Sequence, residues 1–362
     1  MNLKITSLTW VVVSSFLFVT CKEENFPEPD AQLSTTDQVK AMVNIPPYTL
    51  YTVAGGSSLA PMFRDGEGRD AHFSGPAGIQ LKNKDTLYIA DAGNSAIRKV
   101  VLKPGPNSTI QYVGTVTTLN TPTGSNGLKM LRPLRVGVSD DGTINVLFNT
   151  LNNIVFGRIY KPGRSIYTVQ TSNLNVSGMS QDPYQEFFWF TGAGGIGKFW
   201  SDHIQLPNFT IPRDTLAIRS PGGGLFTLEY PNAIYAGPNG VKYLVTAYQL
   251  YKFTQERVFT KIAPVFTIPP YNYGEVFPNA TDIAATADGR TIFLASDGAI
   301  KKVENGIVSN IYYPRGRTST TGIETDINAW GLAIDDKRHI LYFTDRNNNG
   351  VRMMTLPGYK GH

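Results

Sequence analysis

Short apolar segments alternate with turn-forming residues from Tyr48 to the end of the chain. The segment 73–102, FSGPAGIQLKNKDTLYIADAGNSAIRKVVL, has an apolar stretch, a turn, an alternating stretch ending in Ala-Asp, a Gly-Asn turn and a third apolar stretch. Alternation with a period of two indicates strands with one buried face, and Gly, Asn and Asp favour tight turns. The pattern therefore predicts three short β-strands in this segment.

The same three-strand pattern recurs along the chain. The copy at 327–356 matches nearly position for position, and 277–306 is another good match. Weaker copies occupy 131–161, 230–255 and 172–200. The copies are spaced by roughly fifty residues, and segments between them, such as IYTVQT, can add a fourth strand to each. Repeats of this kind predict an all-β, six-bladed β-propeller with four-stranded blades, because sheets arranged around an axis bury each other's faces.

The two ends of the repeat region complement each other. The last copy stops after its third strand, at Leu356, whereas residues 48–53 (YTLYTV) form an apolar strand that precedes the first copy. We expect residues 48–53 to be the outer strand of the sixth blade and to close the ring, since an unpaired sheet edge is unfavourable. The propeller would then span residues 48–357, followed by a short tail at 358–362.

The first repeat resembles the NHL family. The resemblance is carried by the runs YTVAGG, FRDGEGRDAHFSGPAGIQL and LYIADAGNSAIRKV, which are similar to the family's Val-Ala-Gly, Asp-Gly, Ala-x-Phe, Pro-x-Gly-Ile, Tyr-x-Ala-Asp, Asn and Ile-Arg-Lys pattern. The match is specific in the first repeat, good in the last and weak between residues 172 and 255. It implies a propeller, in agreement with the strand pattern.

The N-terminus has the pattern of an export signal. Residues 1–20 carry one positive charge near the start, followed by an apolar stretch. This stretch is too short and too weakly flanked to be a good membrane-spanning helix, and the pattern is typical of a secretory signal peptide. The charged, proline-containing segment after Cys21 argues against a buried thiol. Residues 21–47 are polar and contain four prolines, so we interpret them as a flexible tether.

Two resemblances extend this interpretation. FVTC, which ends at Cys21, resembles the lipobox of bacterial lipoproteins, and this implies lipidation of Cys21 after residues 1–20 are removed. Lys22, Glu23 and Glu24 resemble the surface-export signal of Bacteroidota lipoproteins. Together they imply a lipid anchor in the outer membrane and a protein that faces the extracellular side.

The overall charge does not suggest nucleic acid as a partner. The chain has 33 Lys and Arg against 28 Asp and Glu; the segment 1–20 contains one lysine, so its removal leaves 32 against 28, a net charge of +4. That excess is spread out and contains no basic run.

The sequence contains no recognisable catalytic motif. The histidines, at 72, 203, 339 and 362, are isolated and lack the spacing of zinc ligands, so no metal and no cofactor are expected. Asp91 and Asn94, and Asp345 and Asn347, lie in turns where such side chains usually bind loop amides. The alternative is that these acids surround the channel and hold a divalent cation, as in some six-bladed hydrolases and lyases.

Loops that lead into the repeats are the longest connections. In a propeller these lead-in loops share one face with the turns between the second and third strands, and long loops on a rigid scaffold commonly carry recognition. The lead-in loops occupy 55–75, 121–133, 219–231, 269–279 and 313–329. The candidate ligand- or partner-binding residues on this face are Arg64, His72, Tyr271, Tyr273, Arg315, Arg317 and Trp330.

Two further features leave alternatives open. Segment 186–200, EFFWFTGAGGIGKFW, is aromatic-rich and is either core or a platform for saccharide rings. Thr86 and Thr215 lie in Asp-Thr-Leu sequences that resemble the short O-glycosylation signal of Bacteroidota.

These features favour a binding or accessory function. The leading hypothesis is a non-enzymatic surface lipoprotein that captures a glycan or peptide for nutrient uptake, or docks to a partner lipoprotein. The resemblance to Bacteroidota surface lipoproteins implies a SusC/SusD-like TonB-dependent importer as a partner. The alternatives are a propeller lyase or hydrolase with a divalent cation in the channel, and a purely structural accessory subunit.

Overall fold

The computed structural model divides the chain into two units, Met1–Met42 and Val43–His362. The residues that it describes are 45–56, 63–105, 111–119, 129–149, 154–159, 166–170, 176–184, 187–192, 195–200, 208–212, 231–254, 259–263, 276–314 and 323–361. The predicted signal peptide, Cys21 and the export signal lie outside these residues.

The described residues form six sheets, of which three are built by the first half of the second unit. The first sheet, in the order β2-β6-β5-β4-β3, contains β2 (Gly66–Glu67), β6 (Tyr112–Thr118), β5 (Ala96–Pro104), β4 (Thr86–Asp91) and β3 (Pro76–Asn83). The next contains β7 (Leu131–Val138), β8 (Ile144–Asn149), β9 (Ile154–Ile159) and β10 (Ile166–Gln170). The third contains β11 (Val176–Gln181), β12 (Phe187–Gly192), β13 (Gly195–Trp200) and β14 (Asn208–Pro212).

The remaining three sheets follow the same plan. One contains β15 (Ala233–Ala236), β16 (Lys242–Val245), β17 (Leu250–Phe253) and β18 (Thr260–Ala263). The next contains β19 (Ala280–Ala285), β20 (Thr291–Ser296), β21 (Ala299–Glu304), β22 (Ile307–Pro314) and β23 (Ile323–Thr325). The last, in the order β1-β26-β25-β24, contains β1 (Leu50–Gly55), β26 (Gly350–Thr355), β25 (Ile340–Asp345) and β24 (Ala329–Asp335). Short 3-10 turns occur at Gly68–Asp70, Ala92–Asn94 and Pro238–Gly240.

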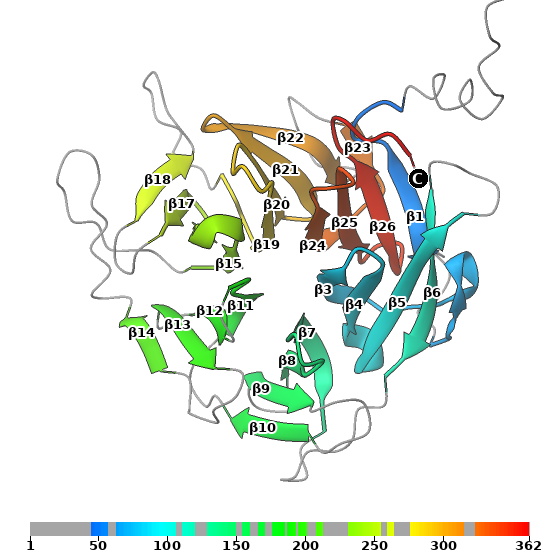
Figure 1. Cartoon of the computed structure of the whole chain (residues 1–362), viewed down its shortest axis with the longest axis horizontal. Helices are drawn as coiled ribbons and strands as arrows, with labels where there is room; N and C mark the ends of the chain where they lie inside the picture. The colour runs from blue at the N-terminus through cyan, green and yellow to red at the C-terminus, as the bar shows by residue number, and fades with distance from the viewer. Residues whose placement is uncertain are drawn as a thin grey trace, which may run out of the picture. The chain divides into compact units, whose positions relative to one another are not determined.

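The sheets are arranged around a common centre, as Figure 1 shows for the second unit. The innermost strand of each sheet contacts that of the next: β3 contacts β7, β7 contacts β11, β11 contacts β15, β15 contacts β19, β19 contacts β24, and β24 contacts β3. Within sheets the pairing is antiparallel except between β22 and β23. This arrangement confirms the prediction of an all-β propeller built mainly from antiparallel, four-stranded sheets.

Residues from the two ends of the propeller pair in one sheet. Strand β1 lies antiparallel to β26, with Leu50 opposite Met354 and Thr52 opposite Arg352. The pairing matches the one expected from the sequence for residues 48–53. Packing also extends slightly beyond the predicted limits of the propeller, since Ile45 and Tyr359 are buried in the same hydrophobic cluster.

Two sheets have a fifth strand that the repeat pattern did not predict. Strand β2 pairs with the outer strand β6, and β23 pairs with the outer strand β22. Both extra strands come from lead-in loops. These strands form hydrogen bonds with backbone N–H and C=O groups of β6 and β22 that would otherwise be exposed to solvent.

Glycine allows the innermost strands of neighbouring sheets to lie close together. A Cβ atom at Gly78 of β3 would lie 2.7 Å from the Leu134 carbonyl oxygen of β7, and one at Gly331 of β24 would lie 2.5 Å from the Ala77 carbonyl oxygen of β3. Only glycine fits such an approach. The glycine of the Pro-x-Gly-Ile motif is therefore a packing residue.

The hydrophobic core lies between the sheets. Strand β25 is buried along its whole length, because it lies inside its sheet and both of its faces are covered. In the aromatic-rich segment 186–200, Phe188, Trp189 and Phe190 are buried. The Trp189 ring packs edge to face against Phe253 of the next sheet, with 5.6 Å between the two ring centres. These three side chains belong to the core and not to a saccharide platform.

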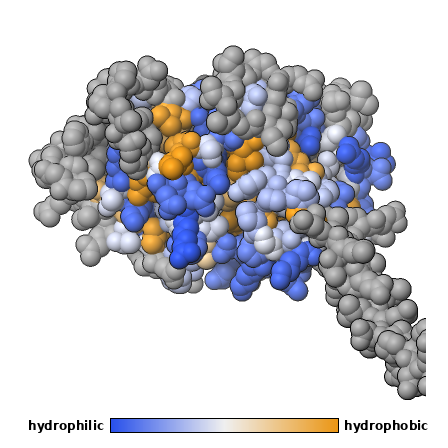
Figure 2. Space-filling model, turned by 90° about the horizontal axis from the view of Figure 1, so that it is seen from above, coloured by the Kyte–Doolittle hydropathy of each residue, from blue (hydrophilic) through white to orange (hydrophobic). Residues whose placement is uncertain are grey.

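The outer surface of the propeller is mixed in character. Figure 2 shows one side of it, where hydrophilic residues surround smaller groups of hydrophobic ones. Among the described residues, no helix is long and apolar enough to span a membrane.

Candidate functional site

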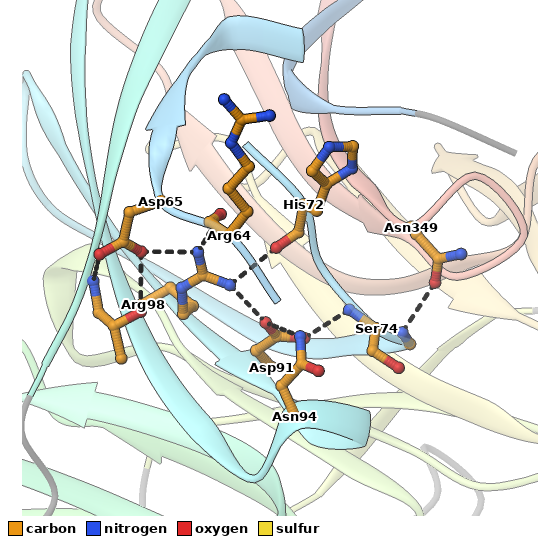
Figure 3. A network of polar contacts seen from close by, with 10 residues as sticks. Arg64, Asp65, His72, Ser74, Asp91, Asn94, Arg98 and Asn349 are labelled. Atoms are coloured by element: carbon orange, nitrogen blue, oxygen red, sulfur yellow. Dashed lines mark hydrogen bonds and ion pairs between the residues drawn. The ribbon is translucent and has the colours of Figure 1, made fainter. Parts of the chain in front are cut away.

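A buried arginine organises the lead-in loop of the first sheet (Figure 3). Arg98 Nη1 donates hydrogen bonds to Asp91 Oδ2 at 2.7 Å and to the His72 carbonyl oxygen at 2.9 Å. Its Nη2 donates to the Arg64 carbonyl oxygen at 2.7 Å and to Asp65 Oδ1 at 2.8 Å. The guanidinium therefore ties the lead-in loop to strands β4 and β5.

Aromatic rings and further hydrogen bonds complete this network. Arg98 is fully buried, with its guanidinium carbon 5.0 Å from the centre of the Phe63 ring and 4.9 Å from that of Phe73. Burial raises the pKa of Asp91, although hydrogen bonds from Asn94, Ser74 and Arg98 act in the opposite direction. The donors of the network donate to loop carbonyl oxygens or to the carboxylates of Asp91 and Asp65, so the network is structural.

The last sheet repeats this use of turn acids. Asp345 Oδ1 accepts from the Asn328 backbone N–H at 3.0 Å, and Oδ2 accepts from Asn348 Nδ2 at 2.8 Å. Arg352 Nε lies 2.7 Å from Asp345 Oδ2. Asp91 and Asp345 therefore act as loop-binding acids, which is the structural interpretation of these turns.

The structure brings two of the predicted site residues together. Arg64 and His72 exchange backbone hydrogen bonds, with N···O distances of 3.5 and 3.0 Å. Arg64 is exposed and His72 half-buried, and Figure 3 shows both side chains pointing away from Arg98. Trp330 lies on the innermost strand β24, and the Arg346 guanidinium lies 4.0 Å above its ring.

The remaining predicted residues are placed as follows. Thr86 is half-buried at the start of β4. Outside the described residues lie Cys21, Lys22, Glu23, Glu24, Thr215, Tyr271, Tyr273, Arg315 and Arg317.

A cavity of about 810 Å³ lies at one end of the propeller channel. All six innermost strands contribute to it through residues from their middle or end, together with the turns that follow β7 and β11. Its polar lining residues are Gln80, Lys82, Arg135, Ser139, Asp140, Asp141, Ser180, Gln181, Asp182, Tyr184, Tyr235 and Asp282.

This cavity is at the end of the channel opposite the lead-in loops. Each innermost strand begins at its lead-in loop, no lining residue is the first residue of its strand, and the residues that follow the ends of β7 and β11 also line the cavity. The prediction from the sequence favoured the long lead-in loops as the binding face, and so missed this cavity at the other end. The signal that could have found it is the concentration of Gln, Asp and Tyr at the ends of the first strands of the repeats.

A charged pair lies within the cavity lining. Asp282 accepts hydrogen bonds from the backbone N–H groups of Ile283 and Leu332, both at 2.9 Å. Burial raises the pKa of Asp282 to about 6, against the opposing effects of the Arg135 charge and of the two N–H donors. Arg135 donates to the backbone carbonyl oxygens of Leu134, at 2.9 Å, and Thr281. A carboxyl group that titrates near neutral pH therefore faces the channel.

Polar side chains from the first three sheets brace the cavity wall. Gln80 Nε2 donates to Gln181 Oε1 at 3.0 Å, and Lys82 Nζ donates to Asp140 Oδ1 at 2.6 Å. Tyr184 is 62% exposed. Amides, carboxylates and an accessible aromatic ring are groups that bind hydroxyl- or amide-rich ligands.

The described residues contain no group of three or more His, Cys, Asp or Glu side chains positioned to hold a metal ion.

Comparisons with known proteins support the fold. No protein-family model and no curated protein sequence match the chain. An auxiliary nutrient binding protein from Bacteroides ovatus ATCC 8483 has a similar structure, with a TM-score of 0.58 and 14% identity over 85% of this chain and 76% of that one. A second protein of that description, from Bacteroides thetaiotaomicron VPI-5482, has a TM-score of 0.53 and 13% identity over 84% of this chain and 75% of that one.

An enzyme is among the similar structures as well. Virginiamycin B lyase from Staphylococcus aureus has a TM-score of 0.50 and 18% identity, over 85% of this chain and 99% of that one. At such identities the similarity concerns the fold alone. Fold and strand pairing together define the class of this protein as an all-β propeller.

Proposed function

We propose that this protein captures a small polar ligand, a saccharide or a short peptide, in the channel cavity. The observation that carries the proposal is the cavity itself, since all six innermost strands converge on it and five of them supply polar side chains. Its volume of about 810 Å³ suits a small molecule, because ligand sites commonly measure about 300–1,000 Å³.

The proposal includes the architecture and location of the protein. The six sheets are the blades of one closed, NHL-like ring, with β1 as its closing strand. Cys21 is the lipidated anchor, and Lys22, Glu23 and Glu24 direct the protein to the extracellular side of the outer membrane. The lead-in face then serves as the contact surface for a SusC/SusD-like transporter or another surface lipoprotein. The neighbours described as auxiliary nutrient binding proteins support this role in uptake.

A second candidate function is enzymatic. The pKa of Asp282, raised to about 6, would suit a group that transfers protons near neutral pH. In that case the protein would be a lyase or hydrolase, in which a divalent cation in the channel could assist.

The binding proposal is tested by a glycan and peptide screen. We expect Tyr184→Ala to weaken the binding of the identified ligand about tenfold or more, because accessible aromatic rings at a rim are typical anchors. The matched control is Tyr248→Ala, since Tyr248 is also exposed but follows β16, at the lead-in end. A ligand that responds to Tyr248→Ala and not to Tyr184→Ala would contradict the cavity assignment.

Mass spectrometry of the incubated ligand separates the two functions. Binding without any product supports capture. Product formation that is lost in Asp282→Asn supports the enzyme.

A further inference from the structure

An arginine and a tryptophan lie at the opposite end of the channel from the cavity. Trp330 is near the start of β24, and Arg346 follows the end of β25, which pairs with β24. The Arg346 guanidinium carbon lies 4.0 Å from the centre of the Trp330 ring. This stacking holds the guanidinium in a fixed position while its edge stays available for hydrogen bonds.

Other guanidinium groups lie within electrostatic reach of Arg346. The main effect on Arg346 is burial, which lowers its pKa, and the positive charges of Arg132 and Arg135 lower the pKa further. Arg132 is exposed near the start of β7. Arg135 is buried three positions further along the same strand, toward the cavity. Positive charge is therefore concentrated at this end.

The nearby carboxylates do not neutralise this charge. Asp91 is paired with Arg98, and Asp345 is paired with Arg352. Asp282 faces Arg135 from the cavity side. Within the part of the chain that the structure describes, Arg132 and Arg346 have no ion-pair partner.

Buried donors at this place are also unsatisfied. Among the described residues, Trp330 Nε1 and Arg135 Nε are buried and have no hydrogen-bond partner, and the Arg135 side chain is only 5% exposed. Thr281 connects the two residues, because its carbonyl oxygen accepts from Arg135 and its Oγ1 donates to the Trp330 carbonyl oxygen at 2.6 Å. Unsatisfied buried donors are unfavourable, so an acceptor brought by a ligand would stabilise this region.

We infer that the lead-in end of the channel is a second binding site, for an oxyanion such as the carboxylate of an acidic sugar. Arg346 and Arg132 pair with the anion, and guanidinium groups suit this role because they can donate two parallel hydrogen bonds to a carboxylate, sulfate or phosphate. Trp330 is a positioning residue that orients Arg346. Arg135 lies between this site and the cavity, whose lining it shares, whereas Arg132, Trp330 and Arg346 do not line the cavity.

The experiment titrates the full chain with glucuronate, glucose, inorganic sulfate and inorganic phosphate. Calorimetry measures affinity, and tryptophan fluorescence reports on the ring beneath Arg346. We expect glucuronate to bind and glucose, which lacks the carboxylate, not to bind at this site. Arg346→Gln should weaken glucuronate binding at least tenfold, and Trp330→Phe should remove the fluorescence change. Binding of sulfate or phosphate in place of glucuronate would keep the oxyanion site and identify the anion.

Matched variants make the result specific. Arg290→Gln removes the same charge from an exposed position after β19, at the other end of the propeller, and should leave the affinity unchanged. Tyr184→Ala should also leave it unchanged, which separates this site from the cavity. Equal affinity of wild type and Arg346→Gln, or no binding of any of the three anions at millimolar concentration, would overturn the inference.

Discussion

At the scale of single residues, the buried charges decide what the loops and the channel can do. Arg98 is fully buried and combines ion pairs with buried Asp91 and exposed Asp65 with hydrogen bonds to two loop carbonyl groups. Asp282 instead faces the channel with a raised pKa. The first charge fixes the backbone, and the second should make the stability of the protein depend on pH.

Arg98→Ala should strongly destabilise the protein. The substitution leaves Asp91 buried without its cation, and removing one partner of a buried pair costs about 3–5 kcal/mol. Urea denaturation would measure the free energy of unfolding. Arg290→Ala is the control, since its pair with Asp288 at 3.6 Å is exposed and should contribute less than about 1 kcal/mol. Similar losses in the two variants would show that Arg98 is not the organising residue.

The pH dependence of stability should reveal Asp282. Its pKa rises from the ordinary 3.8 to about 6 on folding. Between these values the folded state holds a proton that the unfolded state has released, so the stabilising contribution is present at low pH and is lost as pH rises from about 4 to about 6. Other carboxyl groups titrate in this range, so the informative quantity is the difference between wild type and variant.

Asp282→Asn removes this contribution. The free energy of unfolding of the wild type should fall relative to that of the variant as the pH is raised through this window, by about 2–3 kcal/mol. Denaturant titrations at several pH values measure the difference. Parallel pH profiles for the two proteins would show that the Asp282 pKa is not raised.

At the scale of elements, strands that are distant in sequence complete the sheets. Strand β1 covers the edge of β26, and its residues Val53 and Ala54 are fully buried. Strands β2 and β23 likewise cover outer edges with residues from lead-in loops. Edge protection is therefore a second role of segments that the repeat pattern leaves unassigned.

Two N-terminal truncations test the role of β1. A chain that begins at Ile45 keeps this strand and should have a stability close to that of the longer protein. A chain that begins at residue 57 loses the strand, exposes the β26 edge and should be several kcal/mol less stable or fail to fold. Thermal unfolding measures both, and equal melting temperatures would contradict the proposed closure of the ring.

At the scale of the whole molecule, the two ends of the channel differ in chemistry. One end is a polar cavity formed by all six innermost strands, and the other carries arginines and Trp330. On a protein tethered through its N-terminus to a membrane, such a difference would let one end hold a ligand while the other contacts a second molecule.

Cys21→Ser tests the tether. Stable membrane attachment requires more than one acyl chain, as a mature bacterial lipoprotein carries, so the variant should be soluble or unprocessed. Membrane fractionation and protease treatment of intact cells measure the outcome. Alanine at Lys22, Glu23 and Glu24 is the companion variant, which should stay anchored but become less exposed on the cell surface. Serine-substituted protein that fractionates like wild type would disprove the anchor.

The sequence by itself determined the repeated strands, the propeller class, the β1–β26 pairing and the structural role of Asp91 and Asp345. These features depend on local alternation and turn chemistry, which recur at a fixed spacing and can be recognised from one chain. Only the tertiary structure decided where the cavity lies, because its lining comes from six strands separated by up to 255 positions, Ile79 to Ile334. The same is true of Asp282 and Arg346, whose environments are set by burial and then by charges on other sheets. A pattern along one segment specifies which face is buried, whereas convergence on an axis depends on how the sheets pack.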